Sequence, residues 1–299
     1  MASPQFEKLR NLLLERRPAP SPVPVEKMRW GMESVALAAA DDISVTQTTI
    51  AGLDVELITA PGADPERTLL YLHGGGYVMG SPLTHRKLAG ELSRAAAARV
   101  VLPDYPLAPE HPFPAAIDAV TALYRALLDA GSSPARLSIG GDSAGGGLTA
   151  ALLINLRDLA LPLPAAGVLV SPWLDLVRAD GFDPALVEGD PILTPYDMDR
   201  IRAWYLGDAD PAQPLASPVL ADLTGLPPLL IQVGGAEIIV GDSRELARRA
   251  QSAGVKVELE VWPDMFHVWH AFAGRVPEAT DAVERIGSFL RDLTPPAVG

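Results

Sequence analysis

The sequence predicts an α/β fold with a mostly parallel sheet that helices cover on both faces. Two observations carry this prediction. Short apolar runs alternate with stretches of helical length over residues 68–170, and the alternation returns over residues 229–293. The chain also has 299 residues, of which 48% are hydrophobic, so it can bury a large core.

Before this regular part, the sequence predicts a helical flap and then a β-hairpin. Pro18–Pro24 separate two stretches with helical spacing of apolar residues, and Ala51-Gly52 joins two β-rich runs at the distance of a two-residue turn. The predicted elements are a helix over 6–17, a helix over 25–32, and strands over 43–50 and 53–59.

The regular part alternates strictly until residue 170. It predicts a strand over 68–72, a helix over 83–98, a strand over 99–102, a helix over 113–130, a strand over 136–140, a helix over 144–159 and a strand over 166–170. Residues 174–217 are dense in Asp, Pro and Gly and contain one clear helical stretch, 195–206, which indicates an insertion. The alternation then returns with a strand over 229–233, a helix over 243–253, a strand over 255–262 and a helix over 279–293.

These patterns predict one α/β domain in two parts, with two covering segments. We expect residues 1–40 to be an N-terminal cap segment and residues 174–217 to be a cap insertion. The α/β domain then comprises 41–173 and 218–299. Both caps would cover the strand ends, where sites in open α/β sheets lie.

Composition excludes several classes of function. The 24 Lys and Arg residues against 37 Asp and Glu give a net charge of −13, which repels nucleic acid and anionic lipid. No cysteine is present, so thiolate nucleophiles and thiolate metal sites are excluded. The longest apolar runs are far shorter than the roughly 20 residues of a membrane span. Charged residues in 1–20 do not match a secretory signal, and we expect a cytoplasmic protein.

One serine stands at the centre of a glycine cluster. Ser143 follows the strand 136–140 and has Gly141 and Gly145 two residues away on either side, which is the G-x-S-x-G spacing of a sharp strand-to-helix turn. Small neighbours are needed there because the backbone is strained and passes close to itself. The spacing predicts an exposed nucleophile, and a plain connection or a phosphate loop is the alternative interpretation.

A second glycine-rich stretch, His73-Gly74-Gly75-Gly76, directly follows the strand 68–72. Its bare backbone N–H groups are suited to stabilise an oxyanion in acyl transfer, at about 3 kcal/mol per donor. We expect Gly75, Gly76 and Ala144 to supply these donors. The alternative is a flexible turn with a structural histidine.

Five motifs in order along the chain resemble the hormone-sensitive-lipase-like group (family IV) of α/β-hydrolase carboxylesterases. They are His73–Gly76, Asp104–Ala115, Gly141–Gly146, Ser171-Pro172-Trp173 and Pro263–His267. The resemblance spans nearly the whole chain. It implies an α/β-hydrolase fold with an eight-stranded sheet, one antiparallel strand and a helical cap. It also implies a catalytic triad whose members follow one another along the chain in the order serine, acid, histidine. Members of the group often form homodimers.

The predicted base is His267, which follows the last strand and lies after both the serine and a candidate acid. His270 is its rival, three residues further on. The other histidines have other interpretations: His73 belongs to the glycine loop, His85 opens a helix with a solvent-facing or capping role, and His111 shapes a pocket wall between prolines.

The predicted acid is Glu237, in the turn after the strand 229–233, where the resembled group has Asp or Glu. Its rivals are Asp242, for which an N-capping role suffices, and Asp264, which precedes the base by three residues. Asp142 inside the serine turn is interpreted as an acceptor for nearby backbone N–H groups. The sequence departs from the group at Gly241, usually acidic, and at Pro106, usually basic.

Together these residues predict a serine carboxylesterase that hydrolyses short- to medium-chain esters through an acyl-serine intermediate, with no metal or organic cofactor. The same residues allow acetylated small molecules, lactones or amides as substrates, and a non-catalytic binding protein is a further alternative. A small ester is the expected partner. Candidate lining residues of the pocket are Met28, Trp30, Tyr77, Phe182, Tyr196 and Trp204.

Overall fold

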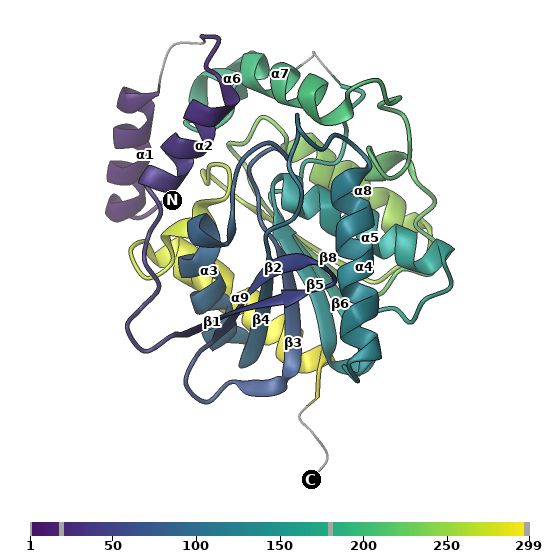
Figure 1. Ribbon diagram of the computed structural model, residues 1–299. Coiled ribbons are helices and arrows are strands. Elements are labelled where there is room, and N and C mark those ends of the chain that lie inside the picture. Colours follow the sequence, from purple (N-terminus) through teal and green to yellow (C-terminus); the bar gives the residue numbers. More distant parts are fainter. Residues whose placement is uncertain (1, 18–20, 179–181, 296–299) are drawn as a thin grey trace.

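The computed structural model of the protein describes residues 2–17, 21–178 and 182–295. An eight-stranded sheet with the order β1-β2-β4-β3-β5-β6-β7-β8 forms its centre (Figure 1). Strand β2 is antiparallel to both neighbours and the remaining neighbouring pairs are parallel, which confirms the predicted sheet. The strands are β1 (Ser44–Ile50), β2 (Leu53–Thr59), β3 (Asp64–Leu72), β4 (Ala98–Pro103), β5 (Leu137–Asp142), β6 (Ala166–Val170), β7 (Leu229–Gly234) and β8 (Val257–Trp262).

Helices lie on both faces of this sheet. The described α-helices are α1 (Pro4–Arg16), α2 (Val25–Ser34), α3 (Pro82–Ala96), α4 (Ala115–Asp129), α5 (Ala144–Asp158), α6 (Pro184–Gly189), α7 (Pro195–Leu206), α8 (Val240–Ser252) and α9 (Pro277–Leu293). Short 3-10 turns are η1 (Pro134–Arg136), η2 (Pro218–Leu220) and η3 (Trp269–Phe272). Helices α3 and α9 pack together on one face, and α4, α5 and α8 cover the other (Figure 1).

Each face of the sheet has its own hydrophobic core, and β3 shows how one strand serves both. Leu70 and Leu72 belong to the core under α4 and α5, whereas Leu69 and Tyr71 belong to the core under α3 and α9. Successive side chains of a strand point to opposite faces. A strand buried on both faces is therefore apolar throughout, which is why 68–72 is recognisable as a continuous apolar run.

Among the strands and α-helices, three differences from the sequence prediction exceed a shift of two residues. Strand β3 begins at Asp64, with an irregular register against β4, and Arg136 pairs with Asp64 and Glu66 in the polar stretch at the start of this strand. Helix α8 begins at Val240, before the predicted start at Ser243. Helix α6 was not predicted, since its six residues are too few for a periodic pattern.

Helices α1, α2, α6 and α7 gather beyond one end of the sheet (Figure 1). Side chains tie the two segments together: Arg17 donates to the carbonyl oxygens of Val187 and Leu193, and Arg200 donates to that of Val23. Residues 18–20 and 179–181, which fall within the predicted cap segments, lie outside the described residues. Within the described chain, no helix combines the length and apolar character needed to cross a membrane.

Candidate active site

Ser143 stands in a strained turn between β5 and α5, with φ 54° and ψ −121°. The positive φ is a strained backbone value, and it turns the Ser143 side chain away from the direction of strand β5. Gly141 and Gly145 make this turn sterically feasible: a Cβ on either would overlap the carbonyl oxygen of Leu72 or lie within 2.5 Å of it. The predicted strand–turn–helix context of Ser143 is therefore present.

The strained residue is held from both sides by backbone hydrogen bonds. The N–H of Ser143 donates to the carbonyl oxygen of Val170 at the end of β6, over 2.9 Å. The N–H of Trp173 donates to the carbonyl oxygen of Ser143 over 3.0 Å. Because neighbouring structure fixes the backbone before and after the side chain, the position of the hydroxyl is set by the sheet itself.

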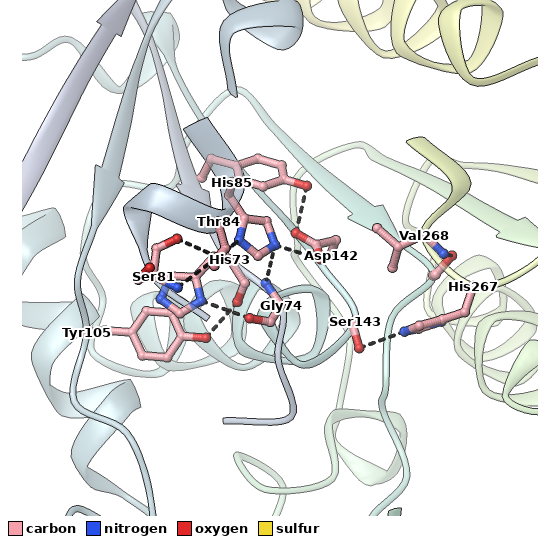
Figure 2. Close-up of polar contacts among 12 residues, drawn as sticks. His73, Gly74, Ser81, Thr84, His85, Tyr105, Asp142, Ser143, His267 and Val268 are labelled. Atoms are coloured by element: carbon pink, nitrogen blue, oxygen red, sulfur yellow. Dashed lines mark hydrogen bonds and ion pairs between the residues drawn. The ribbon is translucent and has the colours of Figure 1, made fainter. Parts of the chain in front are cut away.

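Ser143, His267 and Glu237 form one hydrogen-bonded chain. His267 Nε2 lies 2.8 Å from Ser143 Oγ, a contact drawn in Figure 2, and His267 Nδ1 lies 2.8 Å from Glu237 Oε2. The glutamate is fully buried and the histidine is 5% exposed. The structure thus brings together the predicted nucleophile, base and acid, from the ends of β5, β8 and β7 respectively.

The carboxylate of Glu237 has two further donors at its other oxygen. Ser171 Oγ and the N–H of Gly234 each lie 2.6 Å from Glu237 Oε1. The same Ser171 hydroxyl accepts the N–H of Val268, the residue after the base, over 3.2 Å. Ser171 therefore links the acid turn to the histidine loop. No role for Ser171 was predicted from the sequence, although it lies in the Ser-Pro-Trp motif.

Electrostatics adjust the proton affinity of His267. Burial lowers its pKa, but the charge and hydrogen bond of Glu237 outweigh burial, so the pKa lies above its ordinary value. Asp190, a fully buried residue after α6, adds to this effect. Its carboxylate accepts the N–H of Ile238, over 3.2 Å, and so connects the insertion to the acid turn.

The loop His73–Gly76 approaches the serine turn after β3. Gly75 and Gly76 have φ of 118° and 65°, values that L side chains rarely adopt, so glycine is required there. The backbone of the loop is fixed by Tyr105, whose hydroxyl donates to the carbonyl oxygen of His73 over 2.6 Å, and by His85, which faces the N–H of Gly74. Ala144, the third predicted donor, opens α5 directly after the serine.

The rival histidines have other positions. His270 Nε2 lies 2.8 Å from Gln232 Oε1, and burial lowers the pKa of His270 to about 3. His111 is exposed, and its place in a pocket wall stays a prediction. His85 is neither solvent-facing nor a cap: it is 6% exposed and contacts the glycine loop. Its burial follows from packing of α3 on the sheet, which no local sequence signal reports.

The rival acids also lie elsewhere. Asp242 is not an N-cap, because α8 begins two residues earlier; its carboxylate accepts the N–H groups of Leu174 and Asp175, both at 3.1 Å. Asp264 is exposed. Asp142 accepts the hydroxyl of Tyr71 over 2.9 Å, so it is bound by a side chain and not by the predicted backbone N–H groups; its Oδ2 atom also lies 3.3 Å from His85 Nε2.

Aromatic residues line the region above the glycine loop. Tyr77 is buried and stacks on Tyr205 of α7 with ring centroids 3.7 Å apart. Ile201, also on α7, lies so close to Gly76 that a Cβ there would be 2.6 Å from its Cγ2. Of the other predicted lining residues, Trp30 is 72% exposed and Tyr196 is exposed as well, whereas Met28, Phe182 and Trp204 are partly buried against the core.

Among the residues that the structure describes, no group of three or more His, Asp or Glu side chains is arranged to hold a metal ion. The titratable residues near Ser143 are engaged with one another. His267 pairs with Glu237, and His85 lies beside Asp142. The chemistry that this arrangement supports is proton transfer between a hydroxyl and an imidazole next to a row of backbone N–H groups.

Comparison with known proteins agrees with this geometry. A family model described as the α/β hydrolase fold matches residues 69–271. An acetyl-hydrolase from Streptomyces hygroscopicus is 41% identical over 300 residues, covering 98% of each chain. The crystal structure of EstE5 soaked with p-nitrophenyl butyrate superposes with a TM-score of 0.94 at 49% identity, over 98% of this chain and 99% of that one.

A crystal structure of an esterase from the bacterial hormone-sensitive lipase family superposes with a TM-score of 0.93 at 45% identity, covering 99% of this chain and 100% of that one. Identity at this level over the full length, together with the motifs and the eight-stranded sheet, establishes the relationship. The chain belongs to the hormone-sensitive-lipase-like family of the α/β-hydrolase fold and is a carboxylic ester hydrolase.

Proposed function

We propose that the protein hydrolyses short- to medium-chain carboxylic esters through an acyl-serine intermediate on Ser143. The observation that carries this proposal is the unbroken chain of 2.8 Å contacts from Ser143 through His267 to Glu237. A serine hydroxyl is a weak nucleophile unless a base removes its proton as it attacks. His267 is the base that lies within reach.

Ser143 Oγ attacks the ester carbonyl carbon while its proton moves to His267 Nε2. The tetrahedral intermediate collapses when His267 returns that proton to the leaving alcohol, and the acyl group stays on the serine. Water then attacks the acyl carbon with His267 as base, and the second collapse releases the acid and restores the hydroxyl. Glu237 keeps the Nδ1 proton in place and stabilises the imidazolium in both halves of the reaction.

The negative charge on the substrate oxygen needs donors that are in place before the reaction. We assign this role to the backbone N–H groups of Gly75, Gly76 and Ala144. Loss of one such donor typically costs about 3 kcal/mol of transition-state stabilisation. Because these donors belong to the backbone, their positions depend on how the loop is held, and the glycine φ angles are part of that arrangement.

Residues 1–40 and 174–217 are proposed as a cap over this site. Ile201 of α7 lies against Gly76, and Tyr205 of the same helix stacks on Tyr77, so the cap insertion comes within contact of the glycine loop. This closeness supports a small acyl pocket. Pockets of roughly 300 to 1,000 Å³ hold drug-sized ligands, and we expect acyl chains shorter than about ten carbons to be preferred.

The first test is hydrolysis of p-nitrophenyl esters of increasing acyl length by the wild type and by Ser143→Ala. We expect kcat to fall by about 10⁴-fold or more in the variant, since removal of a catalytic serine leaves only the contribution of binding and oxyanion donors. Mass spectrometry after an activated ester should show one acyl group on the wild type and none on the variant. Activity retained by Ser143→Ala would contradict the proposal.

An acetyl ester of a small molecule is the second candidate substrate. It is favoured by the 41% identity to a protein named as an acetyl-hydrolase. The ester panel separates the two candidates: a maximum at the acetyl ester supports this one, and a maximum at butyryl to octanoyl esters supports the first. A preference for emulsified long-chain triglycerides would contradict both.

Cytoplasmic location and a homodimer stay predictions. The homodimer rests on the family resemblance, and light scattering of the purified protein measures it directly. A small-molecule ester is the expected partner of the site. The net charge of −13 supports neither nucleic acid nor anionic lipid as a partner.

A further inference from the structure

His85 lies buried between the two loops that build the site. Its Nε2 atom is 3.2 Å from the N–H nitrogen of Gly74 and 3.3 Å from Asp142 Oδ2, and its Nδ1 atom is 2.7 Å from Thr84 Oγ1 (Figure 2). Gly74 begins the glycine loop, and Asp142 directly precedes Ser143. One imidazole therefore touches both the loop with the oxyanion donors and the turn with the nucleophile.

The hydrogen bonds of Thr84 decide which ring nitrogen of His85 carries the proton. The Thr84 hydroxyl donates its single proton to the carbonyl oxygen of Ser81, over 2.8 Å. It can then only accept from His85, so the proton of the neutral ring is on Nδ1. The lone pair on Nε2 is left to accept the N–H of Gly74, and the approach of Nε2 to Asp142 Oδ2 at 3.3 Å is then a contact and not a hydrogen bond.

This acceptor matters because three of the four residues of the loop, Gly74 to Gly76, have no side chain. The side chain of the fourth, His73, contacts the carbonyl oxygen of Gly74 through Nδ1, over 2.9 Å, and leaves the N–H of Gly74 to another partner. Gly74, Gly75 and Gly76 are consecutive, and their backbone groups are the loop's points of attachment. On one side the Tyr105 hydroxyl holds the carbonyl of His73, and on the other the N–H groups of Val78 and Met79 hold the carbonyl of Gly75. The N–H of Gly74 is the point between them, and His85 is its partner.

Gly74 is closely surrounded by other atoms, so it has little room to move away from His85. A Cβ on Gly74 would overlap Asp142 Oδ2, and Asp142 is itself fixed by the Tyr71 hydroxyl at 2.9 Å. The carboxylate therefore limits movement of Gly74 in one direction, and the hydrogen bond to His85 limits it in another. Together they set the direction in which the next two N–H groups point.

We propose that His85 is a positioning residue of the reaction: its Nε2 atom fixes Gly74 and thereby aims the N–H groups of Gly75 and Gly76 at the substrate oxygen. This inference rests on the oxyanion role assigned to those glycines under the proposed function. The bond acts through the loop, so its loss weakens stabilisation of the transition state more than binding of the substrate. Loss of this hydrogen bond should therefore lower kcat and leave KM almost unchanged.

Replacement of His85 by two different amides tests the contact. In His85→Gln the amide oxygen reaches the position of Nε2 and can accept from Gly74, whereas in His85→Asn the shorter side chain reaches only the position of Nδ1. With p-nitrophenyl butyrate, we expect kcat of His85→Asn to fall by about tenfold to hundredfold with KM within about twofold. The kcat of His85→Gln should stay within about threefold of the wild type.

Ser93→Ala is the matched control. Ser93 is a buried residue of the same helix, and its hydroxyl accepts the N–H of Ala60 and donates to the carbonyl oxygen of Ala98, at 2.8 and 2.6 Å. Its loss should lower the melting temperature and leave kcat unchanged. Thr84→Val is a second variant for the case in which His85→Asn does not fold: it removes the acceptor for Nδ1 and should lower kcat in the same direction.

Two results would overturn the inference. One is full kcat in His85→Asn or, if that variant does not fold, in Thr84→Val. The other is an equal loss in His85→Gln and His85→Asn, which would show that the ring itself and not the hydrogen bond is needed. A failure of the proposed function has a different signature, because the wild type would then show no acyl-serine. The wild type and Ser143→Ala are therefore measured beside the His85 series.

Discussion

His267 shows how a single residue combines two opposing influences. Burial disfavours its charged form, and Glu237 favours it by more, so its pKa lies above the ordinary 6.5. Catalysis needs the neutral ring, which can accept the serine proton. Activity should therefore fall on the acid side as pH drops through a pKa higher than 6.5, and the protonated form accumulates earlier than in an unperturbed histidine.

Glu237→Gln tests this balance. The substitution removes the charge that raises the pKa and leaves the burial that lowers it, so the acid limb of kcat/KM should move to lower pH. The rate itself should fall by on the order of 10³ to 10⁴, because the amide no longer stabilises the imidazolium or its tautomer. The measurement is kcat/KM for p-nitrophenyl acetate between pH 5 and 9. An acid limb at the wild-type position would show that Glu237 does not act on His267.

The same pKa shift has a consequence for stability with a defined sign. A histidine whose folded pKa is raised contributes stability that is complete below its unfolded pKa of about 6.5 and is lost as pH rises through the folded pKa. The difference in unfolding free energy between the wild type and Glu237→Gln should therefore contain a part that shrinks above neutral pH.

Single residues were predictable from sequence where a local pattern identifies them. The flanking glycines identify Ser143, and chain order identifies Glu237 and His267; the structure brings the three together, and their catalytic roles stay predictions. Ser171 and His85 were missed or misread because their contacts join different elements of the fold, 66 residues apart for Ser171 and Glu237 and 57 residues apart for His85 and Asp142. Spacing along the chain carries no information about such contacts.

The turn between β5 and α5 requires glycine at position 145, and a substitution there tests this requirement. A Cβ on Gly145 would overlap the carbonyl oxygen of Leu72 and lie 2.5 Å from that of His73. The first is a backbone atom at the end of β3 and the second is a backbone atom of the glycine loop, so relief requires movement of this segment relative to α5. The conflict therefore reaches both loops of the site.

Gly145→Ala should lower the unfolding free energy by more than about 3 kcal/mol and abolish ester hydrolysis, as a large strain effect does. Gly31→Ala in α2 is the matched control, because nothing lies within 4 Å of a Cβ there. Alanine has the higher helix propensity, so this variant should gain up to about 1 kcal/mol. Chemical denaturation measures both, and equal stability of the two variants would contradict the steric argument.

The secondary structure was predictable because nearly every strand and helix has a clear apolar period or run. The exceptions have physical reasons. Helix α6 is too short to show a period. The first residues of β3 are polar, pair with Arg136 and lack the apolar pattern of a buried strand. Helix α8 begins in a stretch whose sequence is typical of a turn.

For the whole molecule, the arrangement of α1 couples the N-terminal segment to the site. Phe6 is fully buried and stacks on Phe266, the residue before the predicted base, with ring centroids 5.0 Å apart. Ser3 is hydrogen-bonded to Glu278 of α9. The N-terminal segment is thus both part of the proposed cap and part of the packing behind His267.

Deletion of residues 1–40 should change selectivity among acyl chain lengths while far-ultraviolet circular dichroism still reports a folded sheet. Phe6→Ala separates the two contributions: it should cost about 3 to 5 kcal/mol of stability and lower kcat through the His267 loop, with selectivity retained. Unchanged selectivity in the deletion would count against a cap. A loss of selectivity in Phe6→Ala would show that the core contact, and not the cap, governs it.

The overall architecture was the most predictable level, since the motif order implied the eight-stranded sheet with one antiparallel strand. How the cap helices meet the site was not, because the contacts of Arg17 and Arg200 with distant carbonyl groups follow from the three-dimensional arrangement alone. The same is true of Ile201 against Gly76.

Ser143 and His267 are 124 residues apart in the sequence, and this separation bears on when the site is assembled. Strands β6, β7 and β8 lie between the two residues in sequence and follow β5 in the same order across the sheet. Contacts of long sequence separation form late, because loop-closure entropy opposes them until the intervening structure exists. A chain synthesised only as far as residue 266 therefore holds the serine without its predicted base.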